Sequence, residues 1–465
     1  KQREAELDKA LSAAKATFDW ATTSKKLGTV KKQIDTELQH LLSLKHYFPN
    51  HIFQIAHVTK VLLYTLFTIV LTGGTTLHRH EKYLVANQRC GEITTLWNWS
   101  TWCIVKPNAN RIHYSSNRSR LMKITAIKPI LARFGNRPRV LIKVETDEGI
   151  YGWGEAYSIG PDLSVAPVVD YCFELVKGID PRRIEFIMMK LMQQFRFPPG
   201  GIGLSAISAI DHALWDISGK AAGVPVYMLL GGAARDRIKV YRGIGGKNGM
   251  EAAEQAHRLH EEYGFTAFKT SPYQLDPDAN RWGIVCREAA RYFEELRKNT
   301  PEKWEFAFDP HAKIFEPILA LQLSNALAPY DPFFYEEPLR PEHMPAWSKL
   351  RAQMQVPLAT GESLYTRFEF LDLLSCQGAD IIQPDICVCG GLLEMRKIAA
   401  IAEAHYVSVA PHNPMGPLAT AVNVHFAASQ PNFKILEYLL PTDTNWNDWV
   451  DDPYLPENGH LLLRP

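Results

Sequence analysis

The sequence predicts an α/β fold in which a parallel β-barrel follows a smaller α+β module. The first observation is a series of short apolar runs, each of which stops at a polar residue. Those polar residues are Asp309, Glu336, Glu362, Asp385, His412 and Glu437. They follow one another at steps of 27, 26, 23, 27 and 25 residues, about the length of a βα unit. The second observation is a pattern of antiparallel strands that begins at Met122.

The apolar runs are continuous rather than alternating, which is typical of strands buried on both faces of a parallel sheet. In a closed parallel barrel, all strands present their C-terminal ends at one mouth, where barrel enzymes keep their catalytic residues. A single acid at a strand end is as often a helix N-cap or a solvated loop residue. Six polar residues in phase instead predict convergence on one cavity.

The α+β module precedes the barrel. Its predicted strands are residues 122–131, 139–149 and 151–156, with a turn at Asp147, Glu148 and Gly149, and its predicted helices are Val168–Lys177, Arg182–Gln194 and Leu204–Ala222. Gly223 and Pro225 are expected to end the last helix. In the barrel, Ile238–Tyr241 is the predicted first strand and Thr266–Ser271 the second.

Residues 1–121 differ in kind from the rest of the chain. They carry 17 Lys and Arg against 8 Asp and Glu, whereas the remainder carries 34 against 42. The first methionine is Met122, so we expect a leader outside the enzyme fold. Val61–Leu71 is an apolar run of 11 residues, short of the roughly 20 that a membrane helix needs, and a weak signal-anchor is the alternative.

These observations divide the chain into four predicted segments. They are the leader 1–121, the α+β module 122–232, the barrel 233–440 and a C-terminal segment 441–465. The whole chain has a formal net charge of +1, which argues against nucleic acid as a partner. Thiolates such as those of Cys387 and Cys389 would bind a softer metal than the carboxylates imply, so we interpret both cysteines as free thiols. Free thiols are typical of a reducing cytosol, and we therefore expect a cytoplasmic protein.

Three of the strand-end residues are hard oxygen ligands. Asp309, Glu336 and Glu362 lie on successive predicted strands, as a Mg²⁺ ion with open water positions requires. His412 follows on a later strand, after Asp385, which could orient its imidazole. The sequence therefore predicts a metal site beside a histidine.

Other polar residues are candidates by position. His311 lies two residues beyond Asp309 and shares its face, so it is a candidate proton donor, although a lone histidine is more often only satisfied by its surroundings. The loop FGNRPR, with Arg137 and Arg139, and the loop RFPPGG, with Arg196, could form a lid that grips an anionic substrate. A solvated loop is the alternative for each.

Eight segments together carry a resemblance to a known family. They read ETDEGIYGWGEA, SAISAIDHALWDISGKAAGVPVYMLLGG, FDPHAKIFEP, YEEPL, ATGES, QPDICVCGG, APHNPMGP and ILEY. In these segments the chain resembles the mandelate racemase/muconate lactonizing enzyme branch of the enolase superfamily, and within it the acid-sugar dehydratases, most closely the galactonate dehydratases. The resemblance implies a modified (β/α)₇β TIM-type barrel, with an α+β capping domain formed by the N-terminal part and the C-terminal end of the chain.

The resemblance also implies roles for the strand-end residues. One Mg²⁺ per active site would be held by Asp309, Glu336 and Glu362. His412, held by Asp385, would be the general base and His311 the general acid, while Lys269 and Glu437 would assist at the substrate carboxylate. The expected partner is a small sugar acid, and relatives of this kind are commonly homo-oligomers of even number.

The chain also departs from the family pattern. Racemases and lactonizing enzymes carry Lys-x-Lys on the second strand, whereas this chain has Lys269 and Ser271, which disfavours a two-base racemase. Lys313 stands where many relatives have Arg, so the particular sugar acid stays open. The chain ends at HLLLRP, where relatives add a closing segment, so an incomplete last cap strand is expected.

The expected reaction is Mg²⁺-dependent dehydration of a hexonate such as galactonate, through an enediolate, to a 2-keto-3-deoxy acid. Two other functions remain open from the sequence. One is epimerisation or cycloisomerisation through the same enediolate. The other is a non-catalytic binding paralogue, which would be expected to have lost some of the metal ligands or histidines that are all present here.

Overall fold

The computed structural model describes residues 122–464 apart from 135–136, 158–159, 161 and 441–449. The predictions for the leader, including Val61–Leu71, lie outside the described residues. Contacts divide the chain into Lys1–Ser115 and Ser116–Pro465, and the description below concerns the second unit. In the described part, no helix is both long and apolar enough to cross a membrane.

The cap begins with a three-stranded antiparallel sheet. Its strands are β1 (Ile124–Phe134), β2 (Arg137–Thr146) and β3 (Tyr151–Ala156), in the order β1-β2-β3. The predicted turn joins β2 to β3. Lys123 N donates to the Asp147 carboxylate at 2.7 Å, and Gly149 has a φ of 78°, a left-handed conformation that glycine adopts at little cost.

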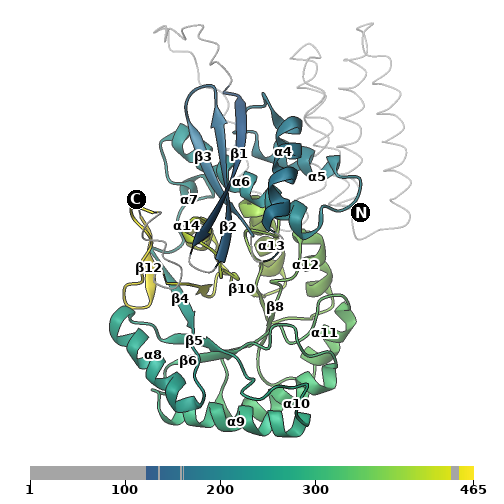
Figure 1. The fold of residues 1–465 in the computed structure, drawn as a ribbon, viewed down its shortest axis with the longest axis vertical. Helices are drawn as coiled ribbons and strands as arrows, with labels where there is room; N and C mark the ends of the chain where they lie inside the picture. Colours follow the sequence, from purple (N-terminus) through teal and green to yellow (C-terminus); the bar gives the residue numbers. More distant parts are fainter. Residues whose placement is uncertain (1–121, 135–136, 158–159, 161, 441–449, 465) are drawn as a thin grey trace, which may run out of the picture. The chain divides into compact units, whose positions relative to one another are not determined.

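Helices cover the cap sheet (Figure 1). They are η3 (Asp162–Ser164), α4 (Val165–Val176), α5 (Ile184–Gln194), α6 (Gly200–Ala222) and α7 (Val226–Leu229), so the three predicted cap helices are confirmed with shifted starts. The central helix α6 lies directly on β3. A Cβ at Gly154 would meet the Ala209 carbonyl oxygen at 1.8 Å, which explains why the strand reads YGWGEA. Gly223, with a φ of 68°, ends α6 as predicted.

Eight parallel strands form the barrel, and a helix follows each of the first seven. The strands are β4 (Arg237–Gly243), β5 (Ala267–Thr270), β6 (Glu305–Phe308), β7 (Tyr335–Glu336), β8 (Leu358–Thr360), β9 (Ile381–Ile382), β10 (Ser408–Val409) and β11 (Leu436–Glu437). The helices are α8 (Gly249–Tyr263), α9 (Trp282–Lys298), α10 (Pro317–Leu327, then η4, Ala328–Tyr330), α11 (Met344–Arg351), α12 (Thr366–Ser375), α13 (Gly391–Ala404) and α14 (Pro417–Ser429). The strand order runs from β10 down to β4 and then β11, and a parallel bridge between Val409 and Phe433 links the two ends. This confirms the predicted (β/α)₇β barrel.

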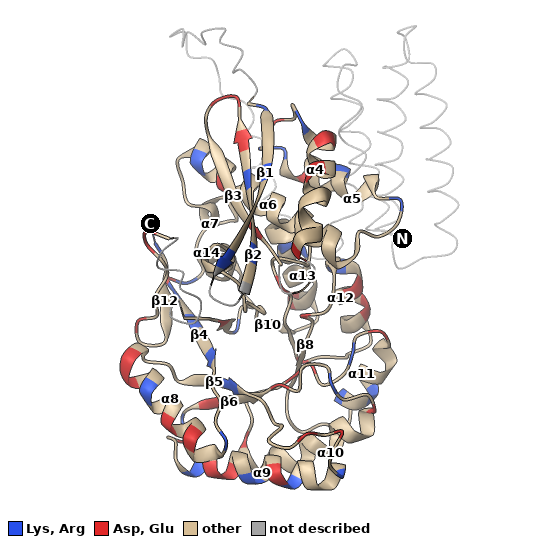
Figure 2. Cartoon of the chain, viewed as in Figure 1, with Lys and Arg blue, Asp and Glu red and all other residues tan. Residues whose placement is uncertain are grey.

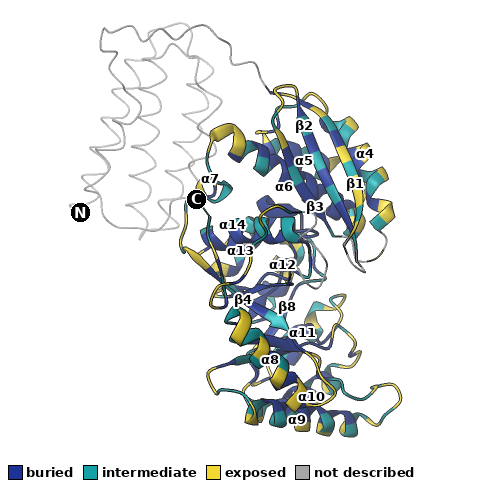
Figure 3. Cartoon of the chain, turned by 60° about the vertical axis from the view of Figure 1, so that its left-hand side comes forward, coloured by how far each residue is buried: buried dark blue, intermediate teal, exposed yellow. Residues whose placement is uncertain are grey.

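Along each barrel strand, successive side chains point alternately into the barrel and out toward the helices, and both faces are buried. One residue from each strand or its immediate flank points inward and forms a separate interior cluster: Tyr241, Ala267, Ala307, Phe334, Ala359, Ile381, Ala410 and Ile435. Their neighbours, such as Phe306 and Phe308, pack outward against the helices. Figure 3 shows the result, with buried strands inside helices whose outer faces are exposed. A filled interior leaves only the strand ends free to build a site.

The outer helices carry charges of both signs. Figure 2 shows acidic and basic side chains interspersed along α8 and α9. Several pair within one helix, as Lys298 does with Glu294 at 2.6 Å. Such exposed pairs contribute little to stability.

The C-terminal segment differs from the prediction. We expected residues 441–465 to return to the cap, but in the described residues β12 (His460–Leu462) pairs antiparallel with barrel strand β4. The reason is that β5 pairs with β4 only at Arg242 and Gly243, which leaves the backbone groups at the start of β4 on that edge free for β12 to pair with. The Val240 N–H, for example, donates to Gly459 O at 3.1 Å. Leu461 is fully buried in the outer core of the barrel.

Candidate active site

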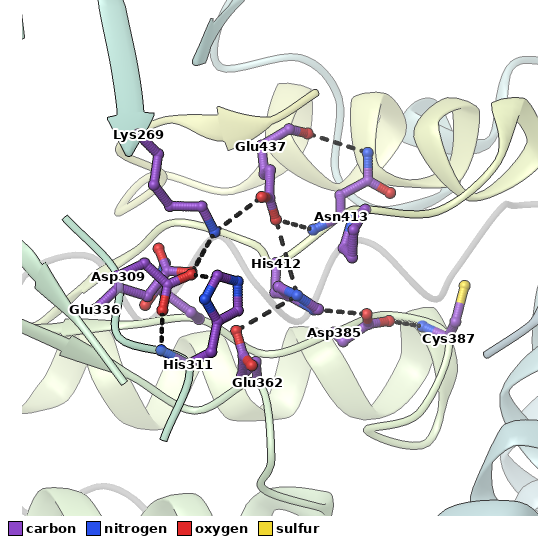
Figure 4. A network of polar contacts seen from close by, with 12 residues as sticks. Lys269, Asp309, His311, Glu336, Glu362, Asp385, Cys387, His412, Asn413 and Glu437 are labelled. Carbon is purple, nitrogen blue, oxygen red and sulfur yellow. Dashed lines mark hydrogen bonds and ion pairs between the residues drawn. The ribbon is translucent and has the colours of Figure 1, made fainter. Parts of the chain in front are cut away.

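Four predicted residues from four strands meet at the C-terminal mouth of the barrel (Figure 4). Lys269 on β5 is central. Its Nζ lies 3.1 Å from Asp309 Oδ2, 2.5 Å from Glu336 Oε1 and 2.9 Å from Glu437 Oε1. All four side chains are buried, so these charged contacts are poorly screened by solvent.

A histidine and a carboxylate form a second pair beside this centre. His412 Nδ1 lies 2.9 Å from Asp385 Oδ2, and Asp385 Oδ1 accepts a hydrogen bond from Cys387 N at 2.7 Å. Because the carboxylate accepts, Nδ1 carries the proton and Nε2 is left to act on a ligand. That Nε2 lies 3.4 Å from Glu362 Oε2 and 3.9 Å from Glu437 Oε2, so it faces the carboxylate centre.

His311 occupies the more open side of the site. Its side chain is 58% exposed, against 10% for His412. His311 N donates to Asp309 Oδ1 at 2.7 Å, and its Nε2 lies 3.1 Å from Asp309 Oδ2. His311 and Ala312 have φ values of 54° and 55°, two consecutive non-glycine residues in the left-handed region. The Ala312 N–H, which donates to Glu337 O at 2.6 Å, helps to hold this strained turn.

Burial and crowding shift the ionisation of the site. Burial raises the pKa of both Asp309 and Glu336, and neighbouring carboxylates add to the rise while Lys269 opposes it. Burial alone would lower the pKa of His412, but Glu362, Asp385 and Glu437 outweigh it and raise that pKa to about 10. Burial lowers the pKa of His311, and the Lys269 charge lowers it further.

The donor set fits a hard divalent cation. Asp309, Glu336, Glu362 and Glu437 bring four carboxylates to one place, and within the described residues Lys269 is the ammonium group that pairs with three of them. Asp309 Oδ2 is buried, and Lys269 Nζ and His311 Nε2 both lie 3.1 Å from it, so a cation there would take the place that the Lys269 ammonium now occupies. Within the described ranges, however, no group of three or more His, Cys, Asp or Glu side chains is already arranged to hold a metal ion. The chemistry of the donors therefore fits Mg²⁺, and Lys269 takes part of the space among them.

Two polar residues of the site were missed from the sequence. Gln383 Nε2 donates to Glu336 Oε2 at 2.7 Å, and Asn413 N donates to Glu437 Oε2 at 3.0 Å. Both orient a carboxylate of the centre. Their positions in the sequence could have identified them, because Gln383 precedes Asp385 by two residues and Asn413 is adjacent to His412.

A third missed residue is Glu337. It is fully buried, and burial and the Glu362 charge raise the pKa of its carboxyl to about 8. Its Oε2 accepts from Gly361 N at 3.0 Å, which holds the end of strand β8 just before Glu362. The adjacent residues Glu336 and Glu337 thus have different roles: the Glu336 carboxylate faces the centre, whereas the Glu337 carboxyl holds the next strand.

Of the three arginines predicted to bind substrate, the two with described side chains, Arg139 and Arg196, make their described contacts away from the carboxylate centre. The Arg137 side chain lies outside the described residues. Arg139 has no exposed surface and its Nε lies 3.4 Å from Glu155 Oε1, so the prediction that it contacts substrate is corrected to a buried ion pair. Arg196 is exposed, and its guanidinium lies 5.9 Å from the Phe197 ring centre.

A (β/α)₇β barrel with strand-end carboxylates, a histidine–aspartate pair and an α+β cap defines the enolase superfamily. Residues 121–231 match the mandelate racemase/muconate lactonizing enzyme N-terminal domain, and residues 251–465 match the enolase C-terminal domain-like family. The chain belongs to the mandelate racemase/muconate lactonizing enzyme branch of this superfamily.

Relatives narrow the class further. The D-galactonate dehydratase of Pectobacterium atrosepticum is 40% identical over 310 residues, which cover 65% of this chain and 78% of the relative. That of Xanthomonas campestris pv. campestris is 40% identical over 308 residues with the same coverage. These matches make the chain an acid-sugar dehydratase, a carbon–oxygen lyase.

Solved structures of similar proteins agree with this class. An enolase from Agrobacterium radiobacter, suggested to be a galactarate dehydratase and solved with bound sodium and L-malate, is 55% identical. It matches with a TM-score of 0.72 over 74% of this chain and 90% of that one. A suggested dehydratase from Zymomonas mobilis is 30% identical, with a TM-score of 0.69 over 74% and 94%.

Proposed function

We propose that this dehydratase removes water from a six-carbon sugar acid through an enediolate and gives a 2-keto-3-deoxy acid, with Mg²⁺ as its metal. The observation that carries the proposal is the geometry of His412. Its Nδ1 is held by Asp385 at 2.9 Å, while its Nε2 faces the carboxylate centre. A base oriented in this way, beside oxygen ligands for a cation, suits removal of a proton next to a carboxylate.

His412 takes the C2 proton. Asp385 fixes the imidazole tautomer and stabilises the imidazolium that forms, and Cys387 N fixes Asp385 in turn at 2.7 Å. Positioned proton transfer of this kind contributes roughly 10²–10⁴-fold to a rate. The electron pair released at C2 is delocalised into the substrate carboxylate.

His311 supplies the second proton transfer. It protonates the C3 hydroxyl, the C3–O bond breaks, and water leaves. Its greater exposure suits a group that must regain a proton from solvent between turnovers, and the burial and Lys269 charge that lower its pKa make it a stronger acid. The resulting enol then tautomerises to the 2-keto-3-deoxy acid.

The other strand-end residues serve the substrate carboxylate. Asp309, Glu336 and Glu362 would hold Mg²⁺, which would stabilise developing negative charge by several kcal/mol and offset the carboxylate field that protonates His412. Lys269 donates toward the same oxygens, and Glu437, oriented by Asn413 N at 3.0 Å, accepts from the substrate.

Two sugar acids are candidates for the substrate. Galactonate is supported by D-galactonate dehydratases that are 40% identical to this chain in matches covering 78% of their length. Galactarate is the second candidate, because the solved relative suggested to use it is 55% identical to this chain. Lys313, close to His311 in sequence, is a residue that could distinguish one terminal group from the other.

A two-base racemase or epimerase is the less suitable reaction for this site. The second strand presents Lys269 with its Nζ engaged by three carboxylates, and Ser271 follows in place of a second lysine. A substrate panel tests the proposal: hexonates, pentonates and hexarates are incubated with the Mg²⁺-loaded enzyme, and semicarbazone absorbance reports 2-keto acid. Galactonate or galactarate should give product. Epimerised substrate without 2-keto acid from any acid would contradict dehydration.

A further inference from the structure

The loop that carries His412 is anchored from the cap. Glu155 on β3 has no exposed surface, and its side chain crosses to the barrel. Its Oε1 accepts from Gly416 N at 2.7 Å and its Oε2 from Ala419 N at 3.0 Å. These two N–H groups begin helix α14, four and seven residues after His412. The first N–H groups of a helix lack partners within the helix, so a carboxylate there stabilises it.

The same buried group holds the segment between His412 and α14. Arg139, from the cap strand β2, lies 3.4 Å from Glu155 Oε1 and also donates to Pro414 O at 3.4 Å. The approach of the cap is close, because a Cβ at Gly416 would lie 2.4 Å from Glu155 Oε1. Glycine is therefore required at this position for the cap to reach the barrel backbone.

The loop that carries Asp385 rests on the cap as well. Helix α6 offers three polar side chains to it: Ser208 Oγ accepts from Gly390 N at 3.0 Å, Asp211 Oδ2 accepts from Leu393 N at 3.1 Å, and His212 Nε2 lies 3.1 Å from Ile386 O. Burial lowers the pKa of His212 to about 4, so the ring is neutral and donates to that carbonyl. Helix α6 lies beside α13, which follows the Asp385 loop (Figure 1), and cap strand β3 contacts α14, which follows the His412 loop.

We infer that Glu155 is a positioning residue for the reaction: from the cap, it fixes the loop of the base His412 against Asp385. This inference rests on the proposed role of His412. The Asp385–His412 distance of 2.9 Å joins two loops, each of which is tied separately to the cap. A displacement of about 1 Å in a catalytic group can cost 10²-fold in rate, so loss of one anchor should slow proton abstraction.

The test replaces Glu155 with Gln. The amide keeps the size but can accept from only one of the two N–H groups, and it presents its own N–H to the other. We expect kcat to fall 10- to 100-fold while KM stays within threefold of the wild type. Wash-in of solvent deuterium at C2 should fall by the same factor as kcat, and the amides of residues 412–420 should exchange faster with solvent. The affinity for Mg²⁺ should not change.

Glu145→Gln is the matched control. Glu145 lies on the same cap sheet, but it pairs at the surface with Lys128 at 2.7 Å and Lys143 at 3.1 Å. The same chemical change there should leave kcat unaltered. Ser208→Ala serves as a second variant that removes one anchor of the Asp385 loop with little change of volume, and it should lower kcat three- to tenfold with KM unaltered.

Each outcome is decisive. If Glu155→Gln keeps kcat and deuterium wash-in within twofold of wild type, per folded molecule, the inference about Glu155 is wrong. If His412→Asn is inactive in the same assay, the proposed function is still supported. If Glu155→Gln fails to fold, Ser208→Ala decides, and an unchanged kcat in that variant overturns positioning by the cap. Deuterium exchange that survives in His412→Asn would instead contradict the proposed role of His412 as the base.

Discussion

Replacement of Glu336 by Gln should separate metal binding from folding. Glu336 has no exposed surface, and its carboxylate accepts from Lys269 Nζ at 2.5 Å and Gln383 Nε2 at 2.7 Å. The amide keeps the shape but removes one of three negative ligands. A charged ligand lost from an oxygen site should weaken Mg²⁺ binding by about two to three orders of magnitude, or roughly 3–4 kcal/mol at 1.36 kcal/mol per tenfold.

The effect of the same change on stability should be small. Lys269 keeps Asp309 Oδ2 at 3.1 Å and Glu437 Oε1 at 2.9 Å, so its charge is not left unpaired. Removing a carboxylate whose pKa is already raised by burial also relieves repulsion with Asp309 and Glu437. We therefore expect a change in unfolding free energy within about 2 kcal/mol, against about 3–5 kcal/mol where a buried charge loses its only partner.

The assay combines calorimetric titration with Mg²⁺, initial rates of 2-keto acid formation and urea unfolding. Glu145→Gln is again the control, since it makes the same chemical change at the surface. The variant should bind Mg²⁺ weakly, lose at least about three orders of magnitude in kcat/KM and unfold near the wild-type urea concentration. Wild-type Mg²⁺ affinity with turnover within threefold would refute the assignment of Glu336 as a ligand.

Three further predictions concern the metal, the cap and the leader. EDTA should silence the enzyme, and Mg²⁺ or Mn²⁺ should restore it while Zn²⁺ does so poorly, because oxygen-only sites favour harder ions; equal recovery with Zn²⁺ would contradict this. Burial raises the pKa of Asp211 to about 8, so the folded chain keeps a proton that the unfolded chain loses near pH 4. Its contribution to stability is lost as pH rises through this window, by up to about 1.4 kcal/mol per pH unit, so urea midpoints of Asp211→Asn should fall less between pH 5 and 8 than those of the wild type. A chain starting at Met122 should keep its activity and cooperative unfolding, since the family match begins at residue 121; loss of soluble protein on this truncation would mean that the leader supports the fold.

The strand ends could be located from the sequence because a parallel barrel imposes a period. Asp309, Glu336, Glu362, Asp385, His412 and Glu437 each follow a buried run, and the structure places all six at one mouth, either around Lys269 or beside His412. The cap helix α6 was likewise predictable, from its apolar periodicity and from Gly223 at its end.

Contacts that depend on tertiary approach could not be located in this way. Arg139 looked like a loop cation because its partner Glu155 lies 16 residues away on another strand and forms the pair only when both are buried. Glu155 itself bonds to Gly416, 261 residues further along the chain. The pairing of β12 with β4 depends on how little of β4 is covered by β5, which no local pattern reveals. Hydrophobic periodicity in the sequence identifies helices and strands, whereas the partners of buried polar groups depend on how those helices and strands pack.

Deuterium exchange at C2 tests the central claim most directly, because it follows the proton that His412 is proposed to remove. Substrate is incubated in D₂O with wild type, His412→Asn and His311→Asn, and C2 deuterium in unreacted acid is measured by mass spectrometry alongside product. His412→Asn should abolish both exchange and dehydration. His311→Asn should stop dehydration but still wash deuterium into C2, provided that the enediolate is reprotonated faster than hydroxide leaves. Exchange that persists in His412→Asn would contradict the account, because the proton would then be leaving to another base.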